Sequence, residues 1–181
     1  MSFPGRQKAR IIAHKPQRLS TQFMIAVAKS GVPEPLLHAF LNTDYLVDFG
    51  RQVIAVRVGS RHRELDTLTQ ARTWSIISAC NQGARQQPDN LNREQRKALE
   101  RITRNDGLQT WPVINRASGG DWPDEPALLV INPTSDWVHA QARTFGQLGV
   151  VSGGFGEHAE LWLYPPTGPV PDHPHVRVVG P

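Results

Sequence analysis

Short apolar segments of helical and of strand character alternate along the chain. Residues 22–29 follow a capping Ser20 or Thr21 and stop at Gly31, and residues 34–42 begin with a proline in the first turn, so each segment predicts a short helix. Residues 45–49 and 53–58 are rich in β-branched and aromatic residues and are separated by three residues, which predicts a β-hairpin. A weaker helix is expected around Leu65 and Leu68.

The middle of the chain carries two longer patterns. Residues 74–79 are mostly apolar without alternation, which is typical of a strand buried on both faces. The next segment runs from Asn90 to about Arg104 and predicts an amphipathic helix that residues 105–107 end. Its expected apolar stripe is Leu91, Ala98, Leu99 and Ile102.

Further elements follow in the second half. Strands are expected over residues 108–114 and 127–131, with a long irregular loop between them, and a helix over 137–145. Two more strands, 148–151 and 161–164, should pair across a glycine-rich turn, and the last seventeen residues hold six prolines. The pattern predicts one α+β domain, a mixed sheet of about six to seven strands with helices packed on it. Its expected parts are a basic arm (1–33), the α+β domain (34–164) and a proline-rich extended tail (165–181).

Charge separates the arm from the rest of the chain. Residues 1–33 hold six basic residues and no acidic one, whereas the remaining residues hold 14 basic and 16 acidic side chains, so the net charge of +4 originates in the arm. Such an arm is either a solvated tail or a docking segment for nucleic acid or an acidic protein. The residues that would bind such a polyanion are Arg6, Lys8, Arg10, Lys15 and Arg18.

Composition and the absence of some motifs exclude several classes of protein. The single cysteine, Cys80, excludes an intramolecular disulfide framework and a multi-cysteine zinc site, and suits a reducing, cytoplasmic compartment. The longest apolar run, residues 23–28, is too short to cross a bilayer, so no membrane association is expected. No phosphate-loop or serine-nucleophile motif is present, and we expect neither a cofactor nor a metal site.

Amides are concentrated where the buried strand should meet a loop and a helix. Asn81 and Gln82 follow the apolar run, and Asp89 and Asn90 precede the helix. They are either turn and cap residues, or they line a ligand site at the end of a central strand, where open sheets build binding crevices. The following helix start would offer free N–H groups to an anion.

A resemblance bears on that choice. Residues 41–164 carry Thr43-Asp44-Tyr45, Trp74 with Ala79-x-Asn81, Asn90 with Arg93, Trp122 with Glu125-Pro126, and Phe145-Gly146-Gln147, in this order. On these pieces the chain resembles a bacterial domain family of unknown function, number 3293 in the domains-of-unknown-function series. The family implies no known activity. This chain departs from its pattern at Cys80, Gln82 and Ala127, where an aromatic residue, Pro and Ser are expected.

The resemblance implies a shared polar pocket. Its matched polar residues stand at element ends, which is where binding residues concentrate. We therefore predict a pocket for a small anionic or nucleotide-like ligand, with or without turnover, in which Glu125 is the only candidate general base. The alternative is an interaction module that docks through its basic arm and whose amides are structural. The predicted ligand-binding residues are Asn81, Gln82, Asn90, Arg93, Trp122, Glu125 and Gln147.

Overall fold

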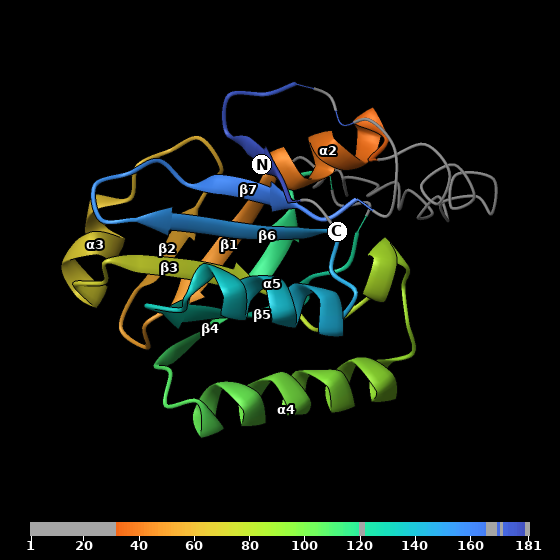
Figure 1. The fold of residues 1–181 in the computed structure, drawn as a ribbon, viewed down its shortest axis with the longest axis horizontal. Helices are drawn as coiled ribbons and strands as arrows, with labels where there is room; N and C mark the ends of the chain where they lie inside the picture. The colour runs from red at the N-terminus through yellow and green to blue at the C-terminus, as the bar shows by residue number, and fades with distance from the viewer. Residues whose placement is uncertain (1–31, 120–121, 166–169, 171, 180–181) are drawn as a thin grey trace, which may run out of the picture.

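A computed structural model of the chain describes residues 32–119, 122–165, 170 and 172–179. These residues form four α-helices, a short 3₁₀ turn and one eight-stranded mixed sheet (Figure 1). The helices are α2 (Glu34–Leu41), α3 (Arg63–Thr69), α4 (Asp89–Asn105) and α5 (Ser135–Thr144), and the 3₁₀ turn is Gln82–Ala84. The strands are β1 (Thr43–Asp48), β2 (Val53–Val56), β3 (Thr73–Ile77), β4 (Thr110–Ala117), β5 (Glu125–Ile131), β6 (Gly149–Gly154), β7 (Glu160–Leu163) and β8 (Val176–Val178). The predicted α+β class is confirmed.

The sheet order is β2-β1-β4-β5-β3-β6-β7-β8, so the strand predicted to be buried on both faces, β3, lies inside the sheet. All neighbouring strands are antiparallel except β7 and β8. The sheet has one strand more than predicted, because residues 176–178 of the proline-rich tail pair with β7. The many prolines of the tail predicted an extended segment without a strand. None of them falls within residues 176–178, so this short segment can pair with β7.

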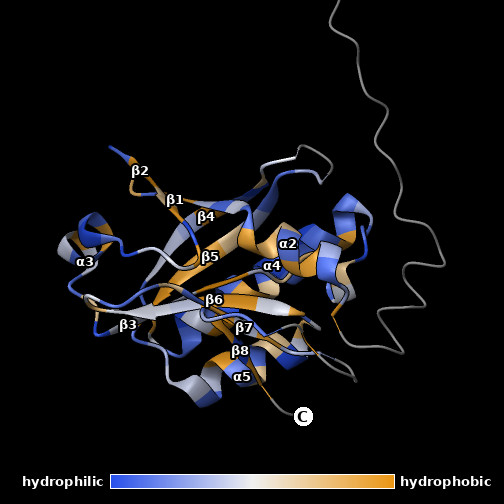
Figure 2. Cartoon of the chain, turned by 90° about the horizontal axis from the view of Figure 1, so that it is seen from above, coloured by the Kyte–Doolittle hydropathy of each residue, from blue (hydrophilic) through white to orange (hydrophobic). Residues whose placement is uncertain are grey.

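Side chains of β5 alternate between two apolar layers. Leu129 and Ile131 pack with residues of α2 and α3 on one face of the sheet, whereas Leu128 and Val130 pack with residues of α4 and α5 on the other. Apolar residues accordingly fill the strands between the helices (Figure 2). This two-sided burial explains why the apolar run of a central strand shows no alternation.

Trp74 sits directly over a glycine of the neighbouring strand. Trp74 is opposite Gly153 in the β3–β6 register and is only 2% exposed. A Cβ atom on Gly153 would lie 2.4 Å from Trp74 Cζ2, so only a residue without a side chain fits there.

Two sequence predictions are corrected by the structure. The irregular loop expected over residues 115–126 is shorter, because β4 continues to Ala117 and Asn115 pairs with Glu125 at the start of β5. Leu91 was expected in the apolar stripe of α4 but is 37% exposed, because it stands outside the apolar layer that Ala98, Leu99 and Ile102 join. No described helix is long and apolar enough to cross a membrane.

Candidate functional site

Asn81, which follows the buried end of β3, is the centre of a polar network. Its backbone is left-handed, with φ 53° and ψ 50°, a conformation that Asn tolerates better than most residues. Asn81 Oδ1 accepts hydrogen bonds from Gln87 N and Asn92 Nδ2, both at 3.0 Å. Asn81 N donates to Asn92 Oδ1 at 2.9 Å. The two asparagines therefore tie the loop after β3 to the first turn of α4.

Glu125, the first residue of β5, joins this network. Asn81 Nδ2 donates to Glu125 Oε2 at 2.6 Å. Burial raises the pKa of Glu125, and hydrogen bonds from Asn81, Ser78, Trp122 and Asn115 oppose the shift without cancelling it. The structure thus holds a carboxyl group in a fixed orientation and in an environment that disfavours its charge.

A cavity of about 410 Å³ lies where the end of β3, the start of α4 and the start of β5 meet. Asn81, Arg93 and Glu125 line it, so three of the predicted ligand-binding residues come together. Helix α4 begins beside the cavity, at Asp89, without a side-chain cap. Leu91 N and Asn92 N donate to Pro88 O, which leaves the N–H groups of Asp89 and Asn90 at the positive end of the helix dipole, beside the Asp89 carboxylate.

Two polar atoms of the cavity lining have no hydrogen-bond partner among the described residues. Gln87 Oε1 and Arg96 Nε are both shielded from solvent and unbonded. Arg96 Nε lies 3.5 Å from Glu100 Oε1, but the two atoms do not meet the geometry of a hydrogen bond. Both residues line the cavity, but these two atoms are shielded from it as well as from solvent, so a ligand would reach them only after the side chains turn.

The other predicted ligand-binding residues do not line the cavity. Asn90 is exposed to solvent on α4. Gln147 Nε2 donates to Cys80 O at 2.8 Å, and the side chain of Gln82 packs over Gly146, where a Cβ atom would lie 2.3 Å from Gln82 Cγ. Trp122 reaches the site only through its hydrogen bond to Glu125. The residues that follow α5 therefore hold the backbone of the loop after β3 in place.

Sequence reasoning missed Gln87, Asn92 and Arg96. A periodic signal was present for two of them, because residues 89, 92, 93 and 96 recur at helical spacing and lie on one side of α4. Gln87 carried no such signal. Gln87 lines the cavity because of the path that the loop takes before the helix. The hydrogen bond from Gln87 N to Asn81 Oδ1 holds the loop on that path.

Cys80 also borders the cavity but is buried, as expected for a packing residue. Its Sγ lies 3.7 Å from Asn92 O. Burial first, and then the nearby Glu125 carboxylate, raise the pKa of the thiol. A thiol whose anion is disfavoured in this way is a poor nucleophile at neutral pH.

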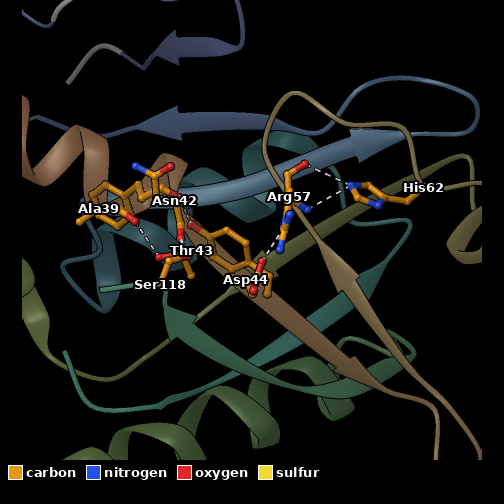
Figure 3. A network of polar contacts seen from close by, with 9 residues as sticks. Ala39, Asn42, Thr43, Asp44, Arg57, His62 and Ser118 are labelled. Carbon is orange, nitrogen blue, oxygen red and sulfur yellow. Dashed lines mark hydrogen bonds and ion pairs between the residues drawn. The ribbon is translucent and has the colours of Figure 1, made fainter. Parts of the chain in front are cut away.

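The matched residues Thr43 and Asp44 belong to a second polar cluster at the start of β1 (Figure 3). Thr43 Oγ1 donates to Ala39 O at 2.7 Å, Arg57 Nε donates to Asp44 Oδ1 at 2.5 Å, and Ser118 Oγ donates to Asn42 O. These bonds join the end of α2 and the strands β1, β2 and β4. Their role is to hold the edge of the sheet together.

The arrangement around Asn81 lies inside the segment that matches a known family. Residues 77–150 match the model of a family described as protein of unknown function, DUF3293. This match confirms the resemblance, and the DUF3293 segment contains both Asn81 and Glu125. Searches of curated proteins and of solved structures found no significant match.

The basic residues Arg6, Lys8, Arg10, Lys15 and Arg18 lie outside the described residues, as does the helix predicted over residues 22–29. Within the described part of the chain, no group of three or more His, Cys, Asp or Glu side chains is placed to hold a metal ion. Of the acidic residues before β5, Asp124 is paired with Arg116, whose Nη2 lies 2.6 Å from Asp124 Oδ2.

Proposed function

We propose that the cavity beside Asn81 binds a small ligand that combines an anionic group with hydrogen-bond donors, as a mononucleotide does. The observation that carries the proposal is the lining of one cavity, in which two arginines, Arg93 and Arg96, stand beside the acceptors of Gln87 and Glu125. The cavity's volume of about 410 Å³ lies within the range of small-molecule sites.

The anionic group of the ligand would lie at the start of α4. Arg93 and Arg96 supply two positive charges there against the one negative charge of Asp89, and the N–H groups of Asp89 and Asn90 stand at the uncapped helix start. Arginine suits this role because its planar guanidinium can donate two parallel hydrogen bonds to a phosphate.

The hydrogen-bond donors of the ligand would face Glu125 and Gln87. Both residues line the cavity, and each side chain carries an oxygen that can accept a hydrogen bond. The amino and imino groups of a nucleobase would satisfy both acceptors. If the bound ligand is also turned over, Glu125 would serve as the general base, since its raised pKa moves it toward neutral pH.

Thermal unfolding with a panel of nucleoside monophosphates, nucleosides and inorganic phosphate tests the proposal. A monophosphate at 100 times its dissociation constant should stabilise the protein by about 2.7 kcal/mol. Arg93→Gln and Arg96→Gln should weaken binding of the monophosphate more than binding of the nucleoside. Gln87→Ala should weaken binding of both ligands.

Arg101→Gln is the matched control, because it removes the same charge from the same helix outside the cavity lining. If Arg101→Gln weakens binding of the monophosphate as much as Arg93→Gln does, the proposed anion site is contradicted. Absence of stabilisation by every member of the panel would contradict the mononucleotide assignment.

A further inference from the structure

Helix α4 carries a stripe of four cations on its outer side. Arg93, Lys97, Arg101 and Arg104 are all exposed. At 3.6 residues per turn they fall within a sector of about 80° on the helix surface. The opposite side of the helix carries the buried residues Leu99 and Thr103. In Figure 1, α4 lies at the lower edge of the molecule. The stripe is defined here as these four residues.

Within the described part of the chain, none of the four cations has a carboxylate partner. The described ion pairs employ other arginines, such as Arg57 with Asp44 and Arg116 with Asp124, and α4 itself pairs Arg96 with Glu100. Glu94 lies at one border of the stripe and makes no ion pair with it. The positive charge of the stripe is therefore open to solvent along about three turns of helix.

Helix stability accounts for this placement only in part. Glu94 stands three residues before Lys97 and Glu100 four residues before Arg104, spacings that favour a helix, but the stripe also sets cations four residues apart. Like charges four residues apart repel, and the stripe contains two such pairs, Arg93 with Lys97 and Lys97 with Arg101. Only Arg104 stands in the last turn, where a cation complements the helix dipole. A row of mutually repelling cations is stabilised when a polyanion lies along it.

We infer that the outer side of α4 docks the phosphate backbone of a nucleic acid. Three of the four cations are arginines, whose planar donor fork suits phosphate oxygens. The stripe itself contains no apolar side chain, whereas protein interfaces centre on apolar and aromatic anchors and membrane-bound helices insert an apolar face. A partner recognised by a regular row of charges fits this surface. The inference goes beyond the proposed mononucleotide site and rests on residues outside its cavity lining, apart from Arg93.

Salt-dependent binding of the full chain to single-stranded and duplex oligonucleotides tests this inference. The triple variant Lys97→Gln, Arg101→Gln, Arg104→Gln keeps Arg93 and the cavity, and Gln preserves helix propensity. Loss of three phosphate contacts should reduce the slope of log affinity against log salt by about 2.7 for duplex and about 2.1 for single strands. Affinity at low salt should fall by roughly two orders of magnitude.

The matched control is Arg51→Gln, Arg61→Gln, Arg63→Gln, which removes three exposed arginines away from α4. It should leave the slope nearly unchanged. A control that lowers the slope as much as the stripe variant would show that only net charge matters, and an unchanged slope in the stripe variant would overturn the inference. Binding to anionic lipid vesicles or polyglutamate, but to neither nucleic acid, would also overturn it.

Discussion

Asn81 and Glu125 are separated by 44 residues in the sequence, yet Asn81 Nδ2 lies 2.6 Å from Glu125 Oε2. The same asparagine accepts hydrogen bonds from the loop and from α4, so one side chain connects β3, β5 and the start of the helix. Asn81 is therefore both structural and part of the cavity wall, whereas Gln82 lies outside the lining. Asn81 is a clamp between these elements, and Gln87, Arg96 and Glu125 line the cavity beside it.

Removal of the clamp should be costly. Asn81→Ala removes the acceptor of Gln87 N and Asn92 Nδ2 and one of the donors to Glu125, and it places Ala in a left-handed conformation. We expect the free energy of unfolding to fall by about 2–4 kcal/mol, measured by urea denaturation. Asn90→Ala is the control, because Asn90 is exposed, and it should change stability by about 0.5 kcal/mol or less. If the free energy of unfolding falls by similar amounts in both variants, the hydrogen bonds of Asn81 do not stabilise the fold as proposed.

Glu125 should impose a pH dependence on stability. Since its folded pKa is raised above the usual 4.5, the folded protein retains the proton at pH values where the unfolded chain has lost it. The free energy of unfolding should therefore fall as pH rises from 4.5 to the raised pKa, by at most about 1.4 kcal/mol per pH unit. Glu125→Gln removes this contribution. The free energy of unfolding of the variant, relative to that of the wild type, should increase through this window and then level off. If the two proteins show parallel profiles of stability against pH, the pKa of Glu125 is not raised in the folded state.

Cys80 should be protected from thiol reagents. The side chain is buried, and burial together with the nearby Glu125 carboxylate disfavours its thiolate. Labelling of the native protein at neutral pH should be much slower than labelling of a free peptide thiol, and denaturant should restore the peptide rate. Labelling of the folded chain at the peptide rate would show that the end of β3 is open to solvent.

Gly153→Ala should disrupt the packing of the sheet. The added methyl group would meet Trp74 Cζ2 at 2.4 Å inside the core. We expect a loss of about 1–3 kcal/mol in the free energy of unfolding, as for other overpacked cores. A double-mutant cycle with Trp74→Leu provides the control, because the same glycine substitution should cost less once the indole is gone. Equal costs in the two backgrounds would exclude the steric explanation.

The basic arm should make its own contribution to polyanion binding. Deletion of residues 1–19 removes five of the six basic residues of the arm. If the arm neutralises about four phosphates, deletion should reduce the salt slope for duplex DNA by about 3.6 and leave the thermal unfolding of the rest of the chain unchanged. The part of the slope that is due to the stripe on α4 should persist in the deleted chain. An unchanged slope after deletion would assign all of the binding to residues 20–181.

Local patterns in the sequence determined most of the elements. The unalternating run before Asn81 predicted a strand buried on both faces, and β3 lies between β5 and β6 with apolar layers on each side. Helical periodicity predicted α4, and Gly107 stands just past its end. Such features follow from backbone preferences and from the burial of one face, which neighbouring residues express within a few positions.

Only the tertiary structure decided which polar residues share the site. Strand order brings the start of β5 to the end of β3, and this places Glu125 against Asn81 and raises the pKa of its carboxyl group. The same contacts engage Gln147 with the backbone of Cys80 and leave Asn90 in solvent, although both had been expected beside the ligand. The pairing of distant strands and the burial of a carboxyl group depend on residues from the whole chain that pack around each position. The type and spacing of neighbouring residues therefore do not predict them.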